Sequence, residues 1–128
     1  MSRDVVRTEA APAPFQGAPY SQAIKAGGFV FVSGQLAVRA GESEMVADEI
    51  GAQTEQVFAN LRAILEEAGS SLDQLVKTTV FLQNLDDFPG MNEVYARHVG
   101  DSPPARATVE VARLPSGALV EIEAIALV

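Results

Sequence analysis

The chain has 128 residues, lacks cysteine altogether and contains a single histidine, His98. Without cysteine it can form no disulfide, no thiolate nucleophile and no cysteine-ligated zinc or iron–sulfur site. One histidine excludes metal sites built from several imidazoles and leaves one candidate for any Ser–His pair. Any chemistry must therefore come from Arg, Lys, Glu, Asp, Tyr, Ser, Thr and backbone groups.

Basic residues are also scarce, because 9 Lys and Arg stand against 17 Asp and Glu, for a formal net charge of −8. This charge repels polyphosphates and anionic membranes, and no stretch concentrates the basic residues, so neither partner is expected. No apolar run approaches the ~20 residues of a membrane span. Residues 1–14 lack the apolar core of a signal peptide, so we expect a cytoplasmic protein.

The remaining composition is typical of a packed protein. Hydrophobic residues make up 48% of the chain and charged residues only 20%, a balance that supports a buried core. A chain of this length has the size of one ordinary domain. We therefore expect a single domain over residues 1–128.

Hydrophobic spacing predicts the elements in outline. Apolar side chains recur at helical spacing between residues 48 and 68, and Gly69 can end that helix. A second helix opens near Pro89 and ends before Gly100. Runs of β-branched and aromatic residues predict strands. The full prediction is a proline-rich arm over 8–19, β structure over 22–38 and 72–82, and a hairpin of strands 105–113 and 119–128 around 114–118.

These elements predict an α+β fold in which one mixed β-sheet carries both helices on the same face. The strands have apolar side chains on both faces, so the face without helices needs another cover. A second copy of the protein is the expected cover.

Arg106 follows Pro104 on a rigid stretch between two alanines. Its planar guanidinium suits a carboxylate, because it can donate two parallel charge-assisted hydrogen bonds. The alternative is a surface arginine paired with one of the many acidic groups, which spacing alone favours.

Glu121 and Glu123 alternate with apolar residues, so both carboxylates lie on one face of the last strand. In so acidic a chain that pattern is typical of a solvated face. The functional alternative is a carboxylate in a half-dry pocket that orients a water molecule and exchanges protons with it.

Four further positions carry polar groups of interest. Tyr20 ends the arm and can close over a pocket or serve as a packing anchor. Ser33 and Gly34 end an apolar strand, where glycine permits close approach to the backbone or marks an ordinary turn. Asn92 falls on the apolar stripe of the second helix, where its amide needs partners. His98 lies near the end of that helix, and we interpret it as structural.

Several segments together resemble the Rid family, also called the YjgF family. They are residues 104–115 (PARATVEVARLP), 120–126 (VEIEAIA), 18–23 (APYSQA), 32–35 (VSGQ), 76–81 (VKTTVF) and 91–95 (MNEVY). The resemblance spans the chain from about residue 8 to the end. It implies a chorismate-mutase-like fold, a homotrimer with clefts between subunits, and hydrolysis of reactive enamine/imine intermediates such as 2-aminoacrylate and 2-iminobutanoate to 2-keto acids and ammonia, without a cofactor or metal.

Carried over by motif, Arg106 would bind the substrate carboxylate and Glu121 would position the attacking water. The resemblance places Tyr20, Ser33, Gly34 and Asn92 at the pocket lining. Thr108 stands where well-studied members carry cysteine, so its hydroxyl would take over that substrate contact and substrate preference would shift. The loop over residues 39–45 also departs from the wording common in the family.

One geometric expectation comes from the predicted hairpin. With its turn near Ser116, Arg106 would pair opposite Ala126, which lies five residues from Glu121, or roughly 16 Å along the strand. The two residues cannot then share a small substrate within one chain. A site between subunits would bring Arg106 of one chain to Glu121 of another, and the monomer would be inactive.

Three other functions stay open. A related enzyme would deaminate another enamine, such as 2-aminomuconate. A member of a different class would be a trimer that binds a carboxylate metabolite, or acts like a chaperone, without turnover. Ribonuclease activity, also attached to this family, fits the net charge of −8 least well.

Overall fold

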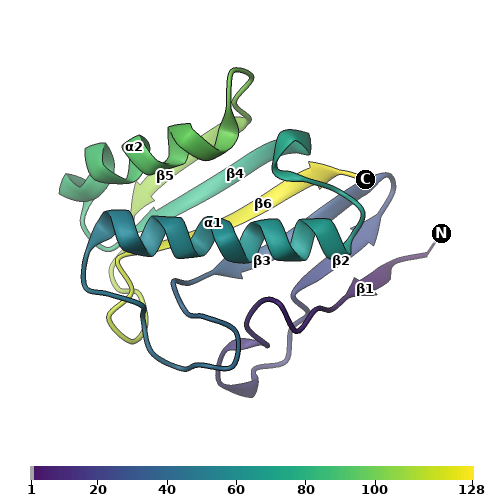
Figure 1. Ribbon diagram of the computed structural model, residues 1–128, viewed down its shortest axis with the longest axis horizontal. Helices are drawn as coiled ribbons and strands as arrows, with labels where there is room; N and C mark the ends of the chain where they lie inside the picture. The colour runs from purple at the N-terminus through teal and green to yellow at the C-terminus, as the bar shows by residue number, and fades with distance from the viewer. Residues whose placement is uncertain (1) are drawn as a thin grey trace.

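A six-stranded mixed sheet forms the centre of the protein, whose computed structural model describes residues 2–128 (Figure 1). The sheet order is β1-β2-β3-β6-β4-β5. Two helices, α1 (Ile50–Glu67) and α2 (Phe88–Val99), lie side by side on one face of it. The strands are β1 (Asp4–Val6), β2 (Ala23–Ala26), β3 (Phe29–Gln35), β4 (Leu75–Leu82), β5 (Ala105–Glu110) and β6 (Val120–Leu127). The predicted α+β sheet with both helices on one face is confirmed.

Helix α1 begins and ends where its sequence predicts. The Glu49 side chain accepts hydrogen bonds from the backbone N–H groups of Gly51 and Ala52, which places a negative charge at the positive end of the helix. Gly69 has a φ of 86°, the left-handed conformation that terminates helices. The buried stripe, which includes Phe58 and Leu61, is fully excluded from solvent and packs on the sheet.

The predicted hairpin between residues 105–113 and 119–128 is wrong. Strand β5 pairs with β4 in parallel, and β6 pairs with the other edge of β4 in an antiparallel arrangement. One strand therefore separates the two segments expected to be neighbours. The alternation of residues defines a strand and its faces, but it does not specify which strand lies beside it.

Two glutamine side chains hold the connection from β5 to β6 as it passes the end of β4. Gln83 accepts a hydrogen bond from the Leu114 N–H at 2.6 Å, and Gln53 accepts one from the Leu119 N–H at 2.8 Å. Gln53 also donates to the carbonyl of Gly117. This connection replaces a tight turn and inserts β6 between β3 and β4.

The N-terminal arm is fastened by the buried side chain of Gln22. Its amide accepts from the Thr8 N–H at 2.8 Å and donates to the carbonyl of Pro12 at 2.8 Å. A short 3-10 turn at Phe15–Gly17 interrupts the arm. Strand β1 precedes it and pairs with β2, which the sequence analysis did not predict.

The second face of the sheet, here called the open face, has no helix over it (Figure 1). Phe29, Phe31, Val109 and Leu127 all lie on this face and are 36% to 46% exposed. Among the helices of residues 2–128, none combines the length and apolar character that crossing a membrane requires.

Candidate functional site

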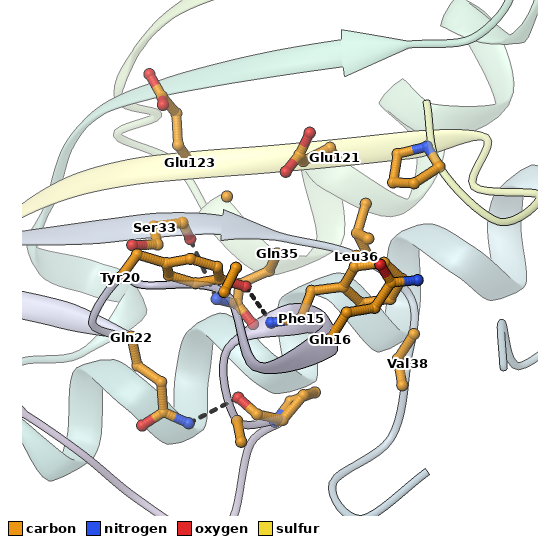
Figure 2. Close-up of a pocket in the computed structure, with 15 residues that line it drawn as sticks. Phe15, Gln16, Tyr20, Gln22, Ser33, Gln35, Leu36, Val38, Glu121 and Glu123 are labelled. Atoms are coloured by element: carbon orange, nitrogen blue, oxygen red, sulfur yellow. Dashed lines mark hydrogen bonds between the residues drawn. The ribbon is translucent and has the colours of Figure 1, made fainter. Parts of the chain in front are cut away.

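A pocket of about 550 Å³ opens beside strands β3 and β6, and we call it the Glu121 pocket. It contains four of the residues that the sequence singled out, namely Tyr20, Ser33, Gly34 and Glu121, together with Glu123. Its other lining residues are Pro12, Ala13, Phe15, Gln16, Ala18, Gln22, Gln35, Leu36, Val38 and Pro115. Figure 2 shows the two carboxylates projecting from β6 over this pocket, with the arm opposite them.

The carboxylate of Glu121 lies in a half-buried position on the open face. Burial raises the pKa of this carboxyl above its ordinary value of 4.5, and the negative charge of Glu123 raises it further. Both effects disfavour the charged form. A carboxyl group of this kind can take up and return a proton near neutral pH more readily than a solvated one.

The arm presents Tyr20 to the same pocket. The Tyr20 hydroxyl accepts a hydrogen bond from the Phe15 N–H at 2.5 Å, which fixes the ring against the arm (Figure 2). Because the hydroxyl oxygen accepts this bond, its own proton is free to be donated to a ligand. Tyr20 is thus both a packing anchor and part of the pocket wall.

A bulge in β3 forms the floor of the Glu121 pocket. The register against β6 shifts between Val32 and Gln35, so Ser33 and Gly34 fall in the irregular stretch. The Ser33 hydroxyl donates to the carbonyl of Ser21 at 2.6 Å, which ties β3 to the end of the arm. Ser33 and Gly34, which were expected at the end of a strand, therefore lie within β3.

A second group of residues, which we call the Arg106 cluster, lies on the helix face at the edge strand β5. The guanidinium carbon of Arg106 stands 4.6 Å from the ring centroid of Tyr95 and 5.3 Å from that of Phe88. These aromatic rings hold the planar group in place. No carboxylate within residues 2–128 forms an ion pair with it, so the surface ion pair considered above is not formed.

Two polar atoms of the Arg106 cluster are buried without a partner. They are Oδ1 of Asn92 and Oγ1 of Thr108. Phe88, Asn92 and Tyr95 share one face of α2, while Arg106 and Thr108 share one face of β5. Buried polar atoms are almost always hydrogen-bonded, so these two atoms are available to a ligand that reaches them.

Burial also affects Tyr95, whose hydroxyl is 2.6 Å from the Thr78 hydroxyl. Burial raises the pKa of Tyr95, and the hydrogen bond with Thr78 and the charge of Arg106 offset part of that shift. The phenol is therefore a neutral platform beneath the guanidinium. Phe88 and Tyr95 were predicted only as an apolar stripe, and their i, i+7 spacing with Asn92 between them is the signal for this additional role.

The Glu121 pocket and the Arg106 cluster lie on opposite faces of the sheet. Arg106 is paired with Thr78 of β4, and Glu121 is paired with Phe81 of the same strand. Thr78 and Phe81 are three positions apart along the strand, so their side chains point in opposite directions. Strand spacing and rise place the Cα atoms of Arg106 and Glu121 roughly 14 Å apart. One chain cannot place both side chains on one small molecule.

Comparison with known proteins places this chain among relatives that match it along nearly its full length. The family model described as endoribonuclease L-PSP matches residues 8–128. A RutC family protein of Pyrococcus abyssi is 52% identical over 126 residues, covering 98% of each chain. The crystal structure of RidA from Psychrobacter superposes with a TM-score of 0.91 at 44% identity, covering 98% of this chain and 99% of that one. The chain belongs to the Rid/YjgF family.

A more distant relative has a name that states an activity. The 2-iminobutanoate/2-iminopropanoate deaminase of Dermatophagoides farinae is 39% identical over 124 residues, covering 97% of this chain and 95% of its own. The Rid fold of this chain and the presence of named deaminases in its family are thus established.

The remaining candidates of this Rid protein fall outside both groups of residues. His98 stacks on Phe58 with ring centroids 4.6 Å apart, and its Nε2 is 3.1 Å from Oε2 of Glu55. It joins α1 to α2 and agrees with the structural interpretation. Within residues 2–128, no three acidic or histidine side chains gather in a way that would hold a metal ion.

Proposed function

We propose that this Rid protein is a cofactor-independent deaminase that hydrolyses reactive 2-enamine and 2-imino acids to 2-keto acids and ammonia. Its active site would form between subunits of a homotrimer. The carrying observation is the separation of two incomplete half-sites, a free arginine with unpartnered polar atoms on one face and a half-buried carboxylate on the other. The deaminase named among its relatives supports the reaction type.

In the proposed complex, Arg106 of one subunit binds the substrate carboxylate through two parallel hydrogen bonds. The Thr108 hydroxyl donates a further hydrogen bond, and Oδ1 of Asn92 accepts one from a donor group of the ligand. The rings of Phe88 and Tyr95 keep the planar guanidinium oriented, so binding costs little side-chain freedom. These groups position the substrate without taking part in proton transfer.

Glu121 of the neighbouring subunit would act on the reacting carbon. The enamine 2-aminoacrylate first becomes 2-iminopropanoate when a proton moves from nitrogen to the terminal carbon. Water then adds to the C=N carbon, Glu121 accepts a proton from that water, and it returns the proton to the leaving nitrogen. This first transfer gives a carbinolamine. Glu121 then moves the remaining hydroxyl proton to the nitrogen as the C–N bond breaks, ammonia leaves, and pyruvate remains. Water is the only co-reactant.

The proposed trimer would also cover the exposed apolar residues of the open face. Phe31 and Val109 are both more than 40% exposed there, although each chain has enough helix to cover only the other face. Contact between copies would bury these side chains and bring a neighbour toward the Glu121 pocket. The acidic charge of each chain makes the endoribonuclease of the family description a poorer fit.

The test generates 2-aminoacrylate from serine with a dehydratase and measures pyruvate formation with and without this protein. We expect acceleration that is lost in Arg106→Ala and retained in Arg62→Ala, an exposed arginine on the helix layer. Absence of acceleration, or equal rates for both variants, would favour a carboxylate-binding protein without turnover. The same assay with 2-aminomuconate tests the alternative enamine.

The intersubunit arrangement has its own test. Arg106→Ala and Glu121→Ala proteins are each expected to be inactive, and mixing them after subunit exchange should restore part of the activity. Labelled subunits must first be shown to exchange, by mass spectrometry of mixed trimers. Proven exchange without any recovery would contradict the intersubunit arrangement.

A further inference from the structure

Gly34 lies directly against the carboxylate of Glu121. A Cβ atom added at residue 34 would stand 2.9 Å from Cδ of Glu121 and 3.1 Å from its Cγ, and it would overlap Oε2. Nonbonded carbon atoms pack at about 3.5 to 4.0 Å, so an alanine side chain and the observed carboxylate cannot share this space. The side chain of Glu121 lies across the backbone of β3 only because residue 34 has none.

The backbone does not require glycine at this position. Seven glycines of the chain have positive φ values, and Gly34 is absent from that set. Alanine at residue 34 is therefore free of backbone strain, in contrast to alanine at Gly17 or Gly69. What glycine supplies here is space.

The β3 bulge explains why the space falls beneath Glu121. The register of β3 against β6 is interrupted between Val32 and Gln35, and Gly34 lies within the interruption. A bulge bends its strand and changes the direction of nearby side chains. On the facing strand, the Glu121 carboxylate settles onto the exposed backbone and becomes half-buried.

We propose that Gly34 is a positioning residue: because it has no side chain, the catalytic carboxylate of Glu121 can lie against the β3 bulge. This inference rests on the proposed function for its catalytic meaning, but the packing itself is independent of it. The half-buried position of the carboxylate raises the pKa of Glu121. A side chain at residue 34 would push the flexible carboxylate into solvent and away from the attacking water.

The first experiment needs no enzyme assay. Gly34→Ala is prepared in the wild-type, Glu121→Ala and Glu123→Ala backgrounds, and thermal unfolding is measured for each pair. The change in melting temperature caused by the substitution is expected to be the same in the wild-type and Glu123→Ala backgrounds and to differ in Glu121→Ala, where no carboxylate has to move. Glu123 is the matched control because it lies on the same face, whereas the three atoms nearest to a Cβ at residue 34 all belong to Glu121. Equal changes in all three backgrounds would overturn the inference.

The second experiment uses the deaminase assay. For Gly34→Ala we expect kcat to fall at least tenfold while KM changes less than twofold, because the carboxylate of the substrate is bound by Arg106 of the other subunit. The acid limb of the kcat profile should also move to lower pH, since a solvated carboxyl regains an ordinary pKa.

The two readouts separate the two proposals. An inactive wild-type protein with the expected thermal coupling would reject the deaminase proposal and keep the Gly34–Glu121 packing. An active wild-type protein whose kcat and pH profile are unchanged in Gly34→Ala would reject the positioning role of Gly34.

Discussion

At the scale of single residues, the site depends on groups held in place by what surrounds them. Arg106 is oriented by the rings of Tyr95 and Phe88, and Glu121 is oriented by the space above Gly34. Each support is a neighbour in space that lies far away in the sequence. Aromatic and glycine neighbours of this kind determine geometry without supplying any reactive atom.

Arg106→Lys keeps the positive charge but loses the planar group that stacks and makes paired hydrogen bonds. A hydrogen bond to a charged group contributes about 1.5 to 3 kcal/mol. We therefore expect kcat/KM for the imine to fall roughly 10- to 100-fold. Pyruvate formation measures the loss, and Arg62→Lys is the control. Full activity in Arg106→Lys would show that charge alone binds the substrate.

Glu121→Gln is expected to stabilise the folded protein at neutral pH. Because the pKa of Glu121 is raised on folding, the folded state binds this proton more tightly than the unfolded state. The charged carboxylate therefore costs stability above its folded pKa, and that cost disappears as the pH falls below 4.5.

Melting temperatures of Glu121→Gln and wild type measured from pH 4 to pH 8 test this dependence. The gap should open as the pH rises, and activity should be lost at every pH. Glu123→Gln should give part of the gain, since its charge contributes to the shift. A constant gap across the pH range would mean that the carboxyl is not perturbed.

At the scale of elements, the sequence predicts the secondary structure of each segment better than its neighbours in the sheet. The spacing of Leu61 and its neighbours, with Glu49 before and Gly69 after, specifies α1 nearly to its ends. Strand-forming residues predicted every strand except β1, but β5 was paired with β6. Side-chain alternation is satisfied equally well by either neighbour, so it does not specify the pairing. In the structure β4 pairs with both β5 and β6, and Gln53 and Gln83 form hydrogen bonds to the connection between these two strands.

The sequence predicts the residues of the candidate site better than their arrangement, because the arrangement depends on strand pairing. The sequence identified Arg106 and Glu121, and the expectation that they cannot meet within one chain holds, but for a different reason. The predicted hairpin put them far apart along two adjacent strands, whereas the structure puts them on opposite faces. The sequence could not show that Arg106 and Glu121 lie on opposite faces, because that depends on β4 lying between β5 and β6.

Gln22 is the residue on which the arm depends, so Gln22→Ala should release residues 8–14 from the sheet. Its buried amide takes part in four hydrogen bonds to the arm. Leaving such groups unpaired costs about 1 to 3 kcal/mol. Hydrogen exchange at the Thr8 amide, which donates to Gln22, is expected to accelerate. Gln74→Ala, at an exposed glutamine, is the control and should leave that amide protected; unchanged exchange in Gln22→Ala would refute the role.

At the scale of the whole molecule, one face of the sheet is complete and the other is not. The helix layer buries a continuous core, whereas the open face exposes Phe29 and Phe31, whose rings lie 6.3 Å apart. Large exposed apolar residues in a row are typical of contact surfaces. This imbalance supports the proposed trimer.

Phe31→Asp is expected to convert the proposed trimer to monomers and to abolish the proposed deaminase activity, because a charge would be buried between copies. Sedimentation velocity measures the oligomeric state, and circular dichroism verifies that the chain remains folded. Val128→Asp is the control, since Val128 is 48% exposed and lies near Gly69 at the end of α1. A folded, fully active monomer would contradict an intersubunit site.

The position of β6 has a consequence for how the chain is made. This strand lies in the middle of the sheet, between β3 and β4, yet it follows every other strand in the chain. A growing polypeptide therefore holds two separate half-sheets until the ribosome has released residue 127. Such long-range pairing is slow, because distant segments must first be brought together. The newborn chain must keep its apolar strands from aggregating during that interval, and both the Gly34 floor and the Glu121 carboxylate come into being only in the last step.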